Sequence, residues 1–293
     1  LAKMNNKNAF IILEEFDSTT QKMYDSLPKS LKNIFITQEE AFKTMTNRST
    51  IIIVDTSLIE LTQASTIIEE TNMQNILVVD HHRVGKDSIK SVPSLTMIDT
   101  SASSASELVA EMIKLSFNNN NHLNIGSDIS TALMAGIKLD TKQLTTNISE
   151  TTFEIISFLL SNDADSKTTE ELFKVSFDLI KAEAEALNNF KIIKKGVIFT
   201  FIPEIHKVKD EEISIICDKL LKYKDIESVY VLGKSESNKY KLSARSNGKD
   251  NVQLVAEALG GGGHFNSAAA VWPLTLKYNT IKKKITSEIN KGD

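Results

Sequence analysis

Residues 76–82 have the sequence Ile76-Leu77-Val78-Val79-Asp80-His81-His82, an aliphatic run that ends in three titratable side chains. The run is short and rich in aliphatic and β-branched residues, which predicts a buried β-strand. A second run of this kind, Ile51-Ile52-Ile53-Val54, precedes it and is followed by Asp55. Between the two, the residues from Ile59 to Thr71 have a helical pattern. Two buried strands joined by a helix form a βαβ unit, so the sequence predicts a parallel sheet.

The ends of these two predicted strands carry the residues with the most evident chemistry. Ligands of parallel α/β sheets collect at the carboxyl ends of the strands, where Asp55 and the Asp80-His81-His82 triplet are expected to meet. One aspartate alone could be an ordinary polar strand end, but three adjacent titratable side chains do not all fit a hydrophobic core. Imidazole and carboxylate together suit a divalent transition metal such as manganese, zinc or iron. We therefore predict a metal or catalytic site.

The length and the pattern predict two domains. The chain has 293 residues, and domains commonly have about 100–200 residues each. Strand and helix patterns fill residues 1–167, and a long run from Thr168 to Asn189 without Gly or Pro predicts one helix. Strand-like runs follow. We predict an α/β protein with a parallel-sheet domain over residues 1–167, a helical linker over 168–190 and a smaller mixed-sheet α/β domain over 191–293.

The composition excludes several classes of protein. The net charge is −4, which gives no general attraction to long nucleic acid or to an anionic membrane. The single cysteine, Cys217, excludes an intramolecular disulfide and a Cys-based zinc site, and fits a cytoplasmic compartment. No aliphatic run approaches the roughly 18–20 apolar residues of a membrane span. A small anionic ligand needs only a local group of cations or metals and stays among the candidates.

Five sequence blocks resemble the DHH phosphoesterase superfamily. Val78–His82 resembles the signature after which the superfamily is named. Four further blocks agree in order and spacing: Val54–Thr56, Ser101–Val109, Ala135–Lys142, and Ser243–Ser246 with Asn251-Val252 and Gly260–His264. Together they extend over nearly the whole chain. The resemblance implies a catalytic DHH domain followed by a DHH-associated, substrate-binding domain.

Finer features resemble the cyclic-di-AMP phosphodiesterases within this superfamily. They are Arg83-Val84-Gly85, Leu139–Lys142 and Gly262–Ala269. The resemblance implies manganese-dependent hydrolysis of cyclic-di-AMP to linear 5′-pApA. In that subfamily these domains form the cytoplasmic part of a membrane-anchored protein with sensory domains upstream. Because the chain starts at Leu1 and not at Met, we expect it to be a fragment of such a parent. Members of the superfamily often dimerise, so a homodimer is among the expected assemblies.

The resemblance also implies roles for individual residues. Asp55 would bridge two manganese ions, and His81 and Asp140 would complete the ligands of one of them. His82 would contact the phosphate or help to protonate the leaving oxygen, and Asp80 is grouped with it as a catalytic residue. Two metals close together stabilise both the entering and the leaving oxygen of a phosphoryl transfer.

Two arginines and a glycine run are the predicted substrate contacts. The chain has three arginines, Arg48, Arg83 and Arg245, and the last two lie inside the family blocks. Arginine binds phosphate in a bidentate manner that lysine reproduces poorly, so both are predicted phosphate contacts, although Arg83 also fits a solvated turn. A glycine run could merely end a helix, but glycines also let backbone N–H groups approach an anion. With the resemblance, this predicts substrate binding by Ser104, Gly261, Gly262, Gly263 and His264.

One motif of the superfamily is not found in the sequence. Members carry an earlier strand ending in His-x-x-x-Asp-x-Asp, which supplies three more metal ligands, whereas no histidine precedes His81 here. We expect this motif upstream in the source protein, and the alternative is an inactive relative.

Other functions compete with that of a cyclic-dinucleotide phosphodiesterase. A nanoRNase or 3′,5′-bisphosphate nucleotidase of the same superfamily would prefer linear dinucleotides. A binding module would hold a cyclic dinucleotide without cutting it. A DNA exonuclease is disfavoured by the acidic charge balance.

Overall fold

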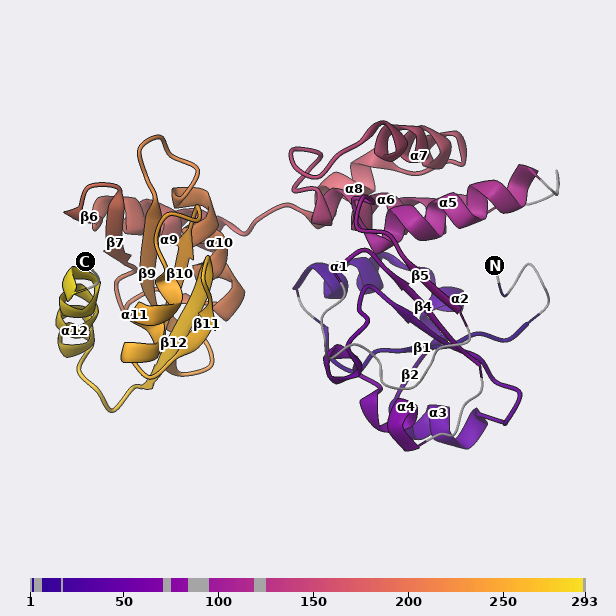
Figure 1. The fold of residues 1–293 in the computed structure, drawn as a ribbon, viewed down its shortest axis with the longest axis horizontal. Helices are drawn as coiled ribbons and strands as arrows, with labels where there is room; N and C mark the ends of the chain where they lie inside the picture. Colours follow the sequence, from indigo (N-terminus) through magenta and orange to yellow (C-terminus); the bar gives the residue numbers. More distant parts are fainter. Residues whose placement is uncertain are drawn as a thin grey trace. The chain divides into compact units, whose positions relative to one another are not determined.

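The computed structural model describes residues 2, 7–16, 18–70, 75–83, 95–118 and 125–291. Thr71, at the end of the predicted helix, and Val84-Gly85 of the subfamily motif lie outside the described residues. The chain divides into two compact units, residues 1–174 and 175–293 (Figure 1). Each unit is described by itself.

The first unit contains short elements at its start and a parallel sheet at its centre. Its elements are β1 (Ile11–Ile12), α1 (Ser18–Ser26), α2 (Lys29–Lys32), β2 (Phe35–Ile36), α3 (Gln38–Thr44), β3 (Ile51–Val54), the 3-10 helix η2 (Ile59–Leu61), α4 (Ser65–Glu70), β4 (Ile76–Asp80), β5 (Leu95–Ile98), α5 (Ala105–Asn118), α6 (Gly126–Asp140), α7 (Glu150–Ser161) and α8 (Ser166–Leu172). Strands β3, β4 and β5 pair in parallel, with β4 in the middle. The predicted parallel βαβ sheet is thereby confirmed.

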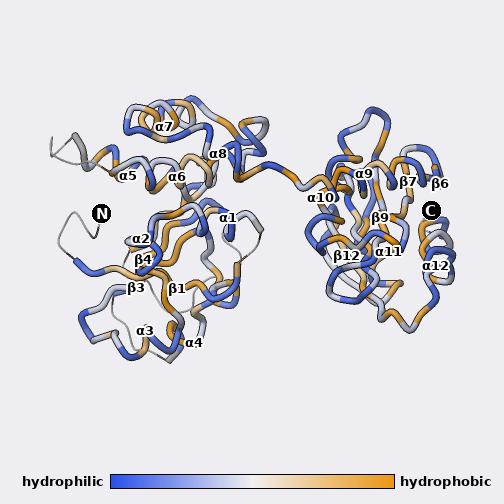
Figure 2. The backbone as a smooth tube through the Cα atoms, turned by 180° about the vertical axis from the view of Figure 1, so that it is seen from behind, coloured by the Kyte–Doolittle hydropathy of each residue, from blue (hydrophilic) through white to orange (hydrophobic). Residues whose placement is uncertain are grey.

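The two predicted strands of this sheet differ in burial. Strand β4 is almost wholly buried, as predicted. In β3, however, only Ile53 is buried, while 60% of Ile52 and 52% of Val54 is exposed. The prediction of a fully buried β3 is wrong because β3 is an edge strand of this sheet with one covered face. Ile53 packs there against Ile68 and Val78. Both strands are mainly hydrophobic along the backbone tube in Figure 2.

A helical layer supports the strand that carries the Asp-His-His triplet. Helices α5, α6 and α7 share a core of aliphatic side chains that includes Ile113, Met134, Ile137 and Leu159. Helix α5 also contacts β4. This packing fixes the end of β4 relative to the last turn of α6, where Asp140 lies.

The predicted linker helix over 168–190 is in fact two helices. Helix α8 ends at Leu172, and helix α9 (Phe177–Asn188) starts after a break that coincides with the boundary between the units. Neither Gly nor Pro marks this break. Instead Ser176 begins α9, because its side chain accepts a hydrogen bond from the N–H of Leu179 at 3.0 Å. Helix α9 packs within the second unit through Leu179 and Ala182, so it is part of that unit's core.

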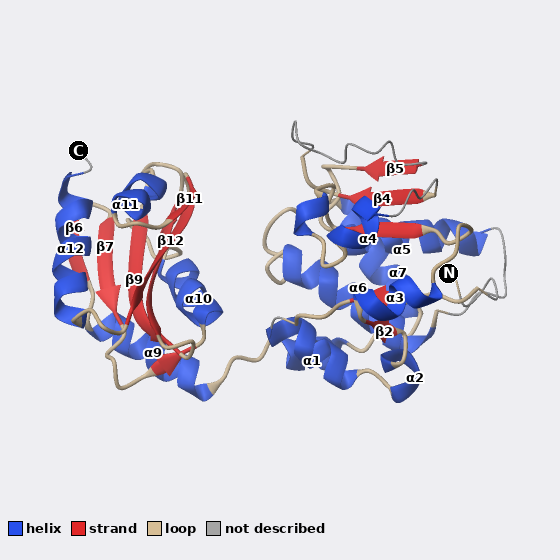
Figure 3. Ribbon diagram, turned by 90° about the horizontal axis from the view of Figure 1, so that it is seen from below, coloured by secondary structure: helices blue, strands red, loops and turns tan. Residues whose placement is uncertain are grey.

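The second unit is a mixed sheet with helices on both faces (Figure 3). Its elements after α9 are β6 (Lys191–Lys194), β7 (Val197–Phe201), β8 (Lys207–Val208), α10 (Asp210–Leu220), β9 (Ser228–Ser235), β10 (Lys239–Ser246), α11 (Val252–Ala258), β11 (Gly262–His264), β12 (Ser267–Pro273) and α12 (Tyr278–Lys291). The strand order is β11-β12-β10-β9-β7-β6, with β8 paired to β9. Helices α9 and α10 cover one face, and α11 and α12 cover the other. The predicted mixed α/β architecture is confirmed.

One predicted loop is a strand. The glycine run was expected to end a helix or to approach an anion, and no strand was predicted there, but Gly262–His264 forms the edge strand β11 and pairs with Ser267–Ala269 of β12. The pairing depends on small residues in both strands, which a reading of local sequence does not reveal. Cys217 is fully buried in α10, as a structural thiol should be. Among the described residues, no helix combines the length and the apolar character that crossing a membrane requires.

Candidate metal centre

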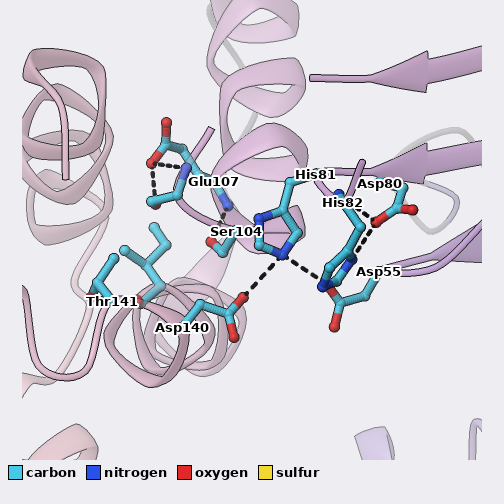
Figure 4. Close-up of polar contacts among 10 residues, drawn as sticks. Asp55, Asp80, His81, His82, Ser104, Glu107, Asp140 and Thr141 are labelled. Atoms are coloured by element: carbon cyan, nitrogen blue, oxygen red, sulfur yellow. Dashed lines mark hydrogen bonds and ion pairs between the residues drawn. The ribbon is translucent and has the colours of Figure 1, made fainter. Parts of the chain in front are cut away.

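Asp55 and Asp80 lie side by side at the carboxyl end of the parallel sheet. Strands β3 and β4 pair in register up to Val54 and Val79, and the Asp55 N–H donates to the Val79 carbonyl at 3.0 Å. Asp55 has a left-handed backbone with φ of 66°. Aspartate is among the few non-glycine residues that adopt this conformation readily. The turn directs its carboxylate toward the residues that follow β4 (Figure 4).

His81 lies between two carboxylates from different elements. Its Nε2 is 3.4 Å from Asp55 Oδ1 and 3.7 Å from Oδ2 of Asp140, the last residue of α6. His82 joins the group, since one ligand atom each from Asp55, His81 and His82 lies within 4.8 Å of the others. The structure thus brings together the residues that were predicted as metal ligands, with His82 beside them (Figure 4).

The carboxylates of this group are in an unfavourable environment for negative charge. Burial raises the pKa of Asp55, and His81 and His82 lower it in part. Burial also raises the pKa of Asp140, and the nearby charge of Asp55 raises it further. Two carboxylates with raised pKa values that share a site favour a bound cation, because a cation stabilises both ionised forms at once.

Asp80 fixes the orientation of His82. The Asp80 carboxylate is fully buried, and its Oδ1 accepts from the His82 backbone N–H at 3.1 Å and from Nδ1 at 2.7 Å. Burial raises the pKa of Asp80, but these hydrogen bonds outweigh it, so the pKa is lowered. The same contact raises the pKa of His82. With Nδ1 donating to Asp80, Nε2 of the neutral ring is the atom that can accept or ligate.

The Ser-rich block shapes the start of α5. Ser104 was expected to contact substrate, but it is fully buried and its Oγ accepts from the Glu107 N–H at 3.0 Å, in the manner of a helix N-cap. The buried Glu107 carboxylate accepts from the Ser103 hydroxyl and, at 3.3 Å, from the Ser103 N–H. In this structure the block caps the N-terminus of α5, the helix that packs against β4.

A cavity of about 470 Å³ opens beside the two histidines. Its wall includes Arg83 from the strand end, Ser101 from the turn after β5, and Asn147. Arg83, which was predicted as a phosphate contact, is exposed here. Asn147 was not predicted. It reaches the cavity because a turn with left-handed residues at positions 142–144 and 147 follows α6. No motif in the sequence predicts such a turn.

The second unit brings Arg245 and His264 to the same level of its sheet. Both residues are register partners of Ser267 on β12, so the three side chains emerge on one face of neighbouring strands. The Arg245 guanidinium is held in place, because its Nε is 3.0 Å from Asp218 Oδ1 and a terminal nitrogen donates to Ser243 Oγ at 3.3 Å. His264 is exposed.

The structural need for glycine differs among the four positions of the run. Gly260 ends α11 with φ of 83°, and the N–H groups of Gly260 and Gly261 donate to the carbonyls of Glu257 and Ala256 as in a Schellman cap. A Cβ on Gly261 or Gly263 would overlap the backbone of β12. A Cβ on Gly262 would meet no atom within 4 Å. Of the predicted substrate-binding glycines, Gly262 is therefore the one with open space where a side chain would stand.

Two family models match the chain and divide it in the same way as the fold. The model of the DHH family N-terminal domain matches residues 12–137, and that of the DHHA1 domain matches residues 194–291. The chain therefore contains a DHH family N-terminal domain and a DHHA1 domain. The first unit contains the DHH domain and its Asp-His cluster, and the second contains the DHHA1 domain with Arg245 and the glycine run.

Relatives of the DHH–DHHA1 chain include named enzymes. The chain is 30% identical over 275 residues to the cyclic-di-AMP phosphodiesterase GdpP of Bacillus subtilis, and 28% identical over 279 residues to PdeA of Listeria monocytogenes. Each match covers 92% of this chain and 41% of the relative, so the chain spans about two fifths of these proteins. A solved exopolyphosphatase-related protein from Bacteroides fragilis shares the fold, with a TM-score of 0.70 at 20% identity, covering 94% of this chain and 87% of that one.

A divalent metal fits the cluster in the DHH domain. Carboxylate oxygen and imidazole nitrogen are the donors that manganese, iron and zinc accept. Asp55 and Asp140 both carry raised pKa values without a cation. In addition, Oδ2 of the fully buried Asp80 has no hydrogen-bond partner among the described residues. An unpartnered buried carboxylate oxygen is costly unless a cation or a further donor lies close to it.

Proposed function

We propose that this chain is a metal-dependent phosphodiesterase that hydrolyses cyclic-di-AMP to linear 5′-pApA. The observation that carries the proposal is the convergence of Asp55, His81 and Asp140 at the end of the parallel sheet. The similarity to GdpP and PdeA over 92% of the chain supports the choice of substrate.

Asp55, His81 and Asp140 would hold the metal, for which manganese is the preferred candidate. When bound, such an ion polarises the phosphoryl group and lowers the pKa of a coordinated water. The protein supplies the remaining parts. Arg83, at the cavity beside the histidines, would contact a phosphate oxygen.

His82 is the proposed general acid of the reaction. Water adds to phosphorus as the P–O3′ bond breaks, and the departing 3′ oxygen takes a proton from His82. The proton that the water releases goes to solvent, from which His82 is protonated again. The Asp80 carboxylate holds Nδ1 of this ring at 2.7 Å and raises its pKa, so Nε2 is protonated over a wider pH range than in a free histidine. Asp80 is therefore a positioning residue, and His82 is the catalytic one.

The DHHA1 domain would bind the rest of the dinucleotide. Arg245, oriented by Asp218, would contact a phosphate, and His264 lies at the same level of the sheet. The backbone of Gly262, where no side chain obstructs it, would approach the ligand closely. These groups supply binding and orientation rather than chemistry.

Product chromatography tests the proposal. The chain is incubated with manganese and cyclic-di-AMP, with linear 5′-pApA or with 3′-phosphoadenosine 5′-phosphate, and Asp55→Asn is the matched variant. Linear 5′-pApA from the cyclic substrate, absent with Asp55→Asn, would support the proposal. Metal-dependent turnover of only the two linear substrates would overturn the substrate choice. Binding of cyclic-di-AMP without any product would indicate a binding module.

A second candidate is a nanoRNase or bisphosphate nucleotidase. The chain is 24% identical to the bifunctional oligoribonuclease and PAP phosphatase NrnA of Mycoplasma pneumoniae. That match covers 82% of this chain and 73% of NrnA, a larger share of the relative than for GdpP. The linear substrates in the same experiment distinguish this candidate.

A further inference from the structure

A second cavity lies within the C-terminal unit. It measures about 680 Å³ and is bordered by the end of α9, by β6 and β7, and by α12. Small-molecule sites commonly measure about 300–1,000 Å³. None of Arg245, the glycine run and His264 lines it. The proposed phosphodiesterase reaction therefore leaves this cavity without a role.

Three lysines line the cavity. Lys191, Lys282 and Lys283 line it, and no aspartate or glutamate does. None of the ion pairs among the described residues involves these three lysines. Burial lowers the pKa of Lys282 and the nearby Lys191 lowers it further, while the charge of Glu204, which does not line the cavity, raises it in part. An anion in the cavity would relieve both effects.

Aromatic rings form another part of the wall. Phe199 and Phe201 lie two residues apart on β7, so both face the same side of the sheet, and Lys191 on β6 is the register partner of Phe199. The Lys282 Nζ lies 3.9 Å from the centre of the Phe201 ring. Phe190 at the rim is 50% exposed. Because Phe199 is only 2% exposed, Phe190 and Phe201 are the rings that offer apolar surface next to the cationic groups.

Helix α12 presents a polar stripe to this cavity. Asn279, Lys282, Lys283 and Thr286 line it and are spaced three, four and seven residues from Asn279, so they share one face of the helix. The adjacent face, with Tyr278, Ile281, Ile285 and Ile289, is buried in the core. Core packing thus fixes the direction in which the stripe points.

We propose that this cavity binds a mononucleotide, with its phosphate at Lys282 and Lys283 and its base against the Phe190 and Phe201 rings. Phosphate needs the cationic groups, and a planar base fits the aromatic wall. Asn279 and Thr286 add hydrogen-bonding side chains beside the two lysines. The cavity shares no residue with the metal cluster, whose residues belong to the first unit.

Calorimetric titration of the 293-residue chain with adenosine 5′-monophosphate, in EDTA, tests the proposal. We expect binding that weakens roughly tenfold or more in Lys282→Met and in Lys283→Met, because each loses a charge-assisted phosphate contact. Lys284→Met is the matched control. It removes the same charge from the same helix, but Lys284 is exposed and does not line the cavity. Its affinity should stay within about twofold of the parent.

Further arms identify what the cavity recognises. Inorganic pyrophosphate should bind more weakly than the nucleotide, and Phe190→Leu should weaken nucleotide binding more than pyrophosphate binding. No nucleotide binding at millimolar concentration, or an equal loss in Lys284→Met, would overturn the proposal. So would a loss of affinity in Asp55→Asn but not in Lys282→Met, since the nucleotide would then occupy the metal site. Hydrolysis is measured separately with manganese, so failure of this proposal leaves the proposed activity untouched.

Discussion

Asp55 combines a left-handed backbone with a metal-ligand position, and two substitutions separate these roles. Asp55→Asn keeps a residue that tolerates φ of 66° but removes the charge, so metal binding should weaken by more than about tenfold. In EDTA the same variant should melt no lower than the parent at pH 7. Asp55→Ala should lose metal binding too and also lose about 1–2 kcal/mol of stability, because alanine is strained in this conformation.

The pH dependence of this comparison follows from the raised pKa of Asp55. A carboxylate whose pKa is raised by folding destabilises the fold above its folded pKa. That penalty disappears as the pH falls toward its ordinary value of 3.8. Any stability advantage of Asp55→Asn should therefore shrink when thermal unfolding in EDTA is repeated near pH 4. A clearly lower melting temperature for Asp55→Asn at pH 7 would contradict the argument.

Asp80 is predicted to control the protonation of His82. Its hydrogen bond raises the His82 pKa above 6.5, so the contact stabilises the fold fully below pH 6.5, and this stabilisation is lost as the pH rises through the folded pKa. Asp80→Asn should lower the His82 pKa toward 6.5, as measured by NMR titration of the ring. If the proposed function holds, turnover should fall about 10–100-fold. Asp128→Asn, an exposed position on α6, is the control and should leave the His82 pKa unchanged.

The residues of the site differ in how far their places could be predicted. Asp55 and His81 could be predicted to meet because they follow neighbouring parallel strands, whose carboxyl ends lie together. Asp140 ends a helix, and only the family resemblance predicted it as a ligand. Ser104 could be recognised as part of a motif, but its burial as a helix cap depends on how α5 packs. Asn147 depends on a left-handed turn that local sequence does not specify.

At the level of elements, Gly→Ala substitutions in and beside β11 test whether the glycine run is needed for the pairing of β11 with β12. Gly261→Ala and Gly263→Ala would each place a Cβ against the backbone of β12, so each should lose about 1–3 kcal/mol of unfolding free energy. Gly262→Ala meets no atom and should fold as the parent does, while weakening dinucleotide binding if the backbone approaches the ligand there. Denaturant unfolding and a binding titration on all three variants measure this. Equal stability of the three would contradict the observed β11–β12 pairing.

The elements that could be predicted are those whose signal is local. Strand β4 and helix α6 have continuous apolar or periodic patterns, and the structure has both. The break between α8 and α9 contains no Gly or Pro. It is recognised only in the folded chain, where the Ser176 side chain accepts a hydrogen bond from the Leu179 N–H at the start of α9. Strand β11 consists of residues with low strand propensity, and it forms because β12 offers equally small partners.

On the scale of the whole molecule, each unit has its own hydrophobic cores. Phe199, Leu242 and Ile285 belong to a core of the second unit, whereas Ile113 and Leu159 belong to a core of the first. The metal cluster lies entirely in the first unit. Metal binding should therefore stabilise one unit and leave the other unchanged.

The single tryptophan makes this prediction measurable. Trp272 is buried in β12 of the second unit, so its fluorescence on thermal unfolding reports that unit alone. With manganese at about 100 times its dissociation constant, the far-UV circular dichroism transition of the first unit should rise by roughly 5–10 °C. The Trp272 transition should stay where it is, and Asp55→Asn should remove the shift. If the Trp272 transition rises together with the circular dichroism transition, the two units unfold as one cooperative body. Metal binding in the first unit would then also stabilise the second.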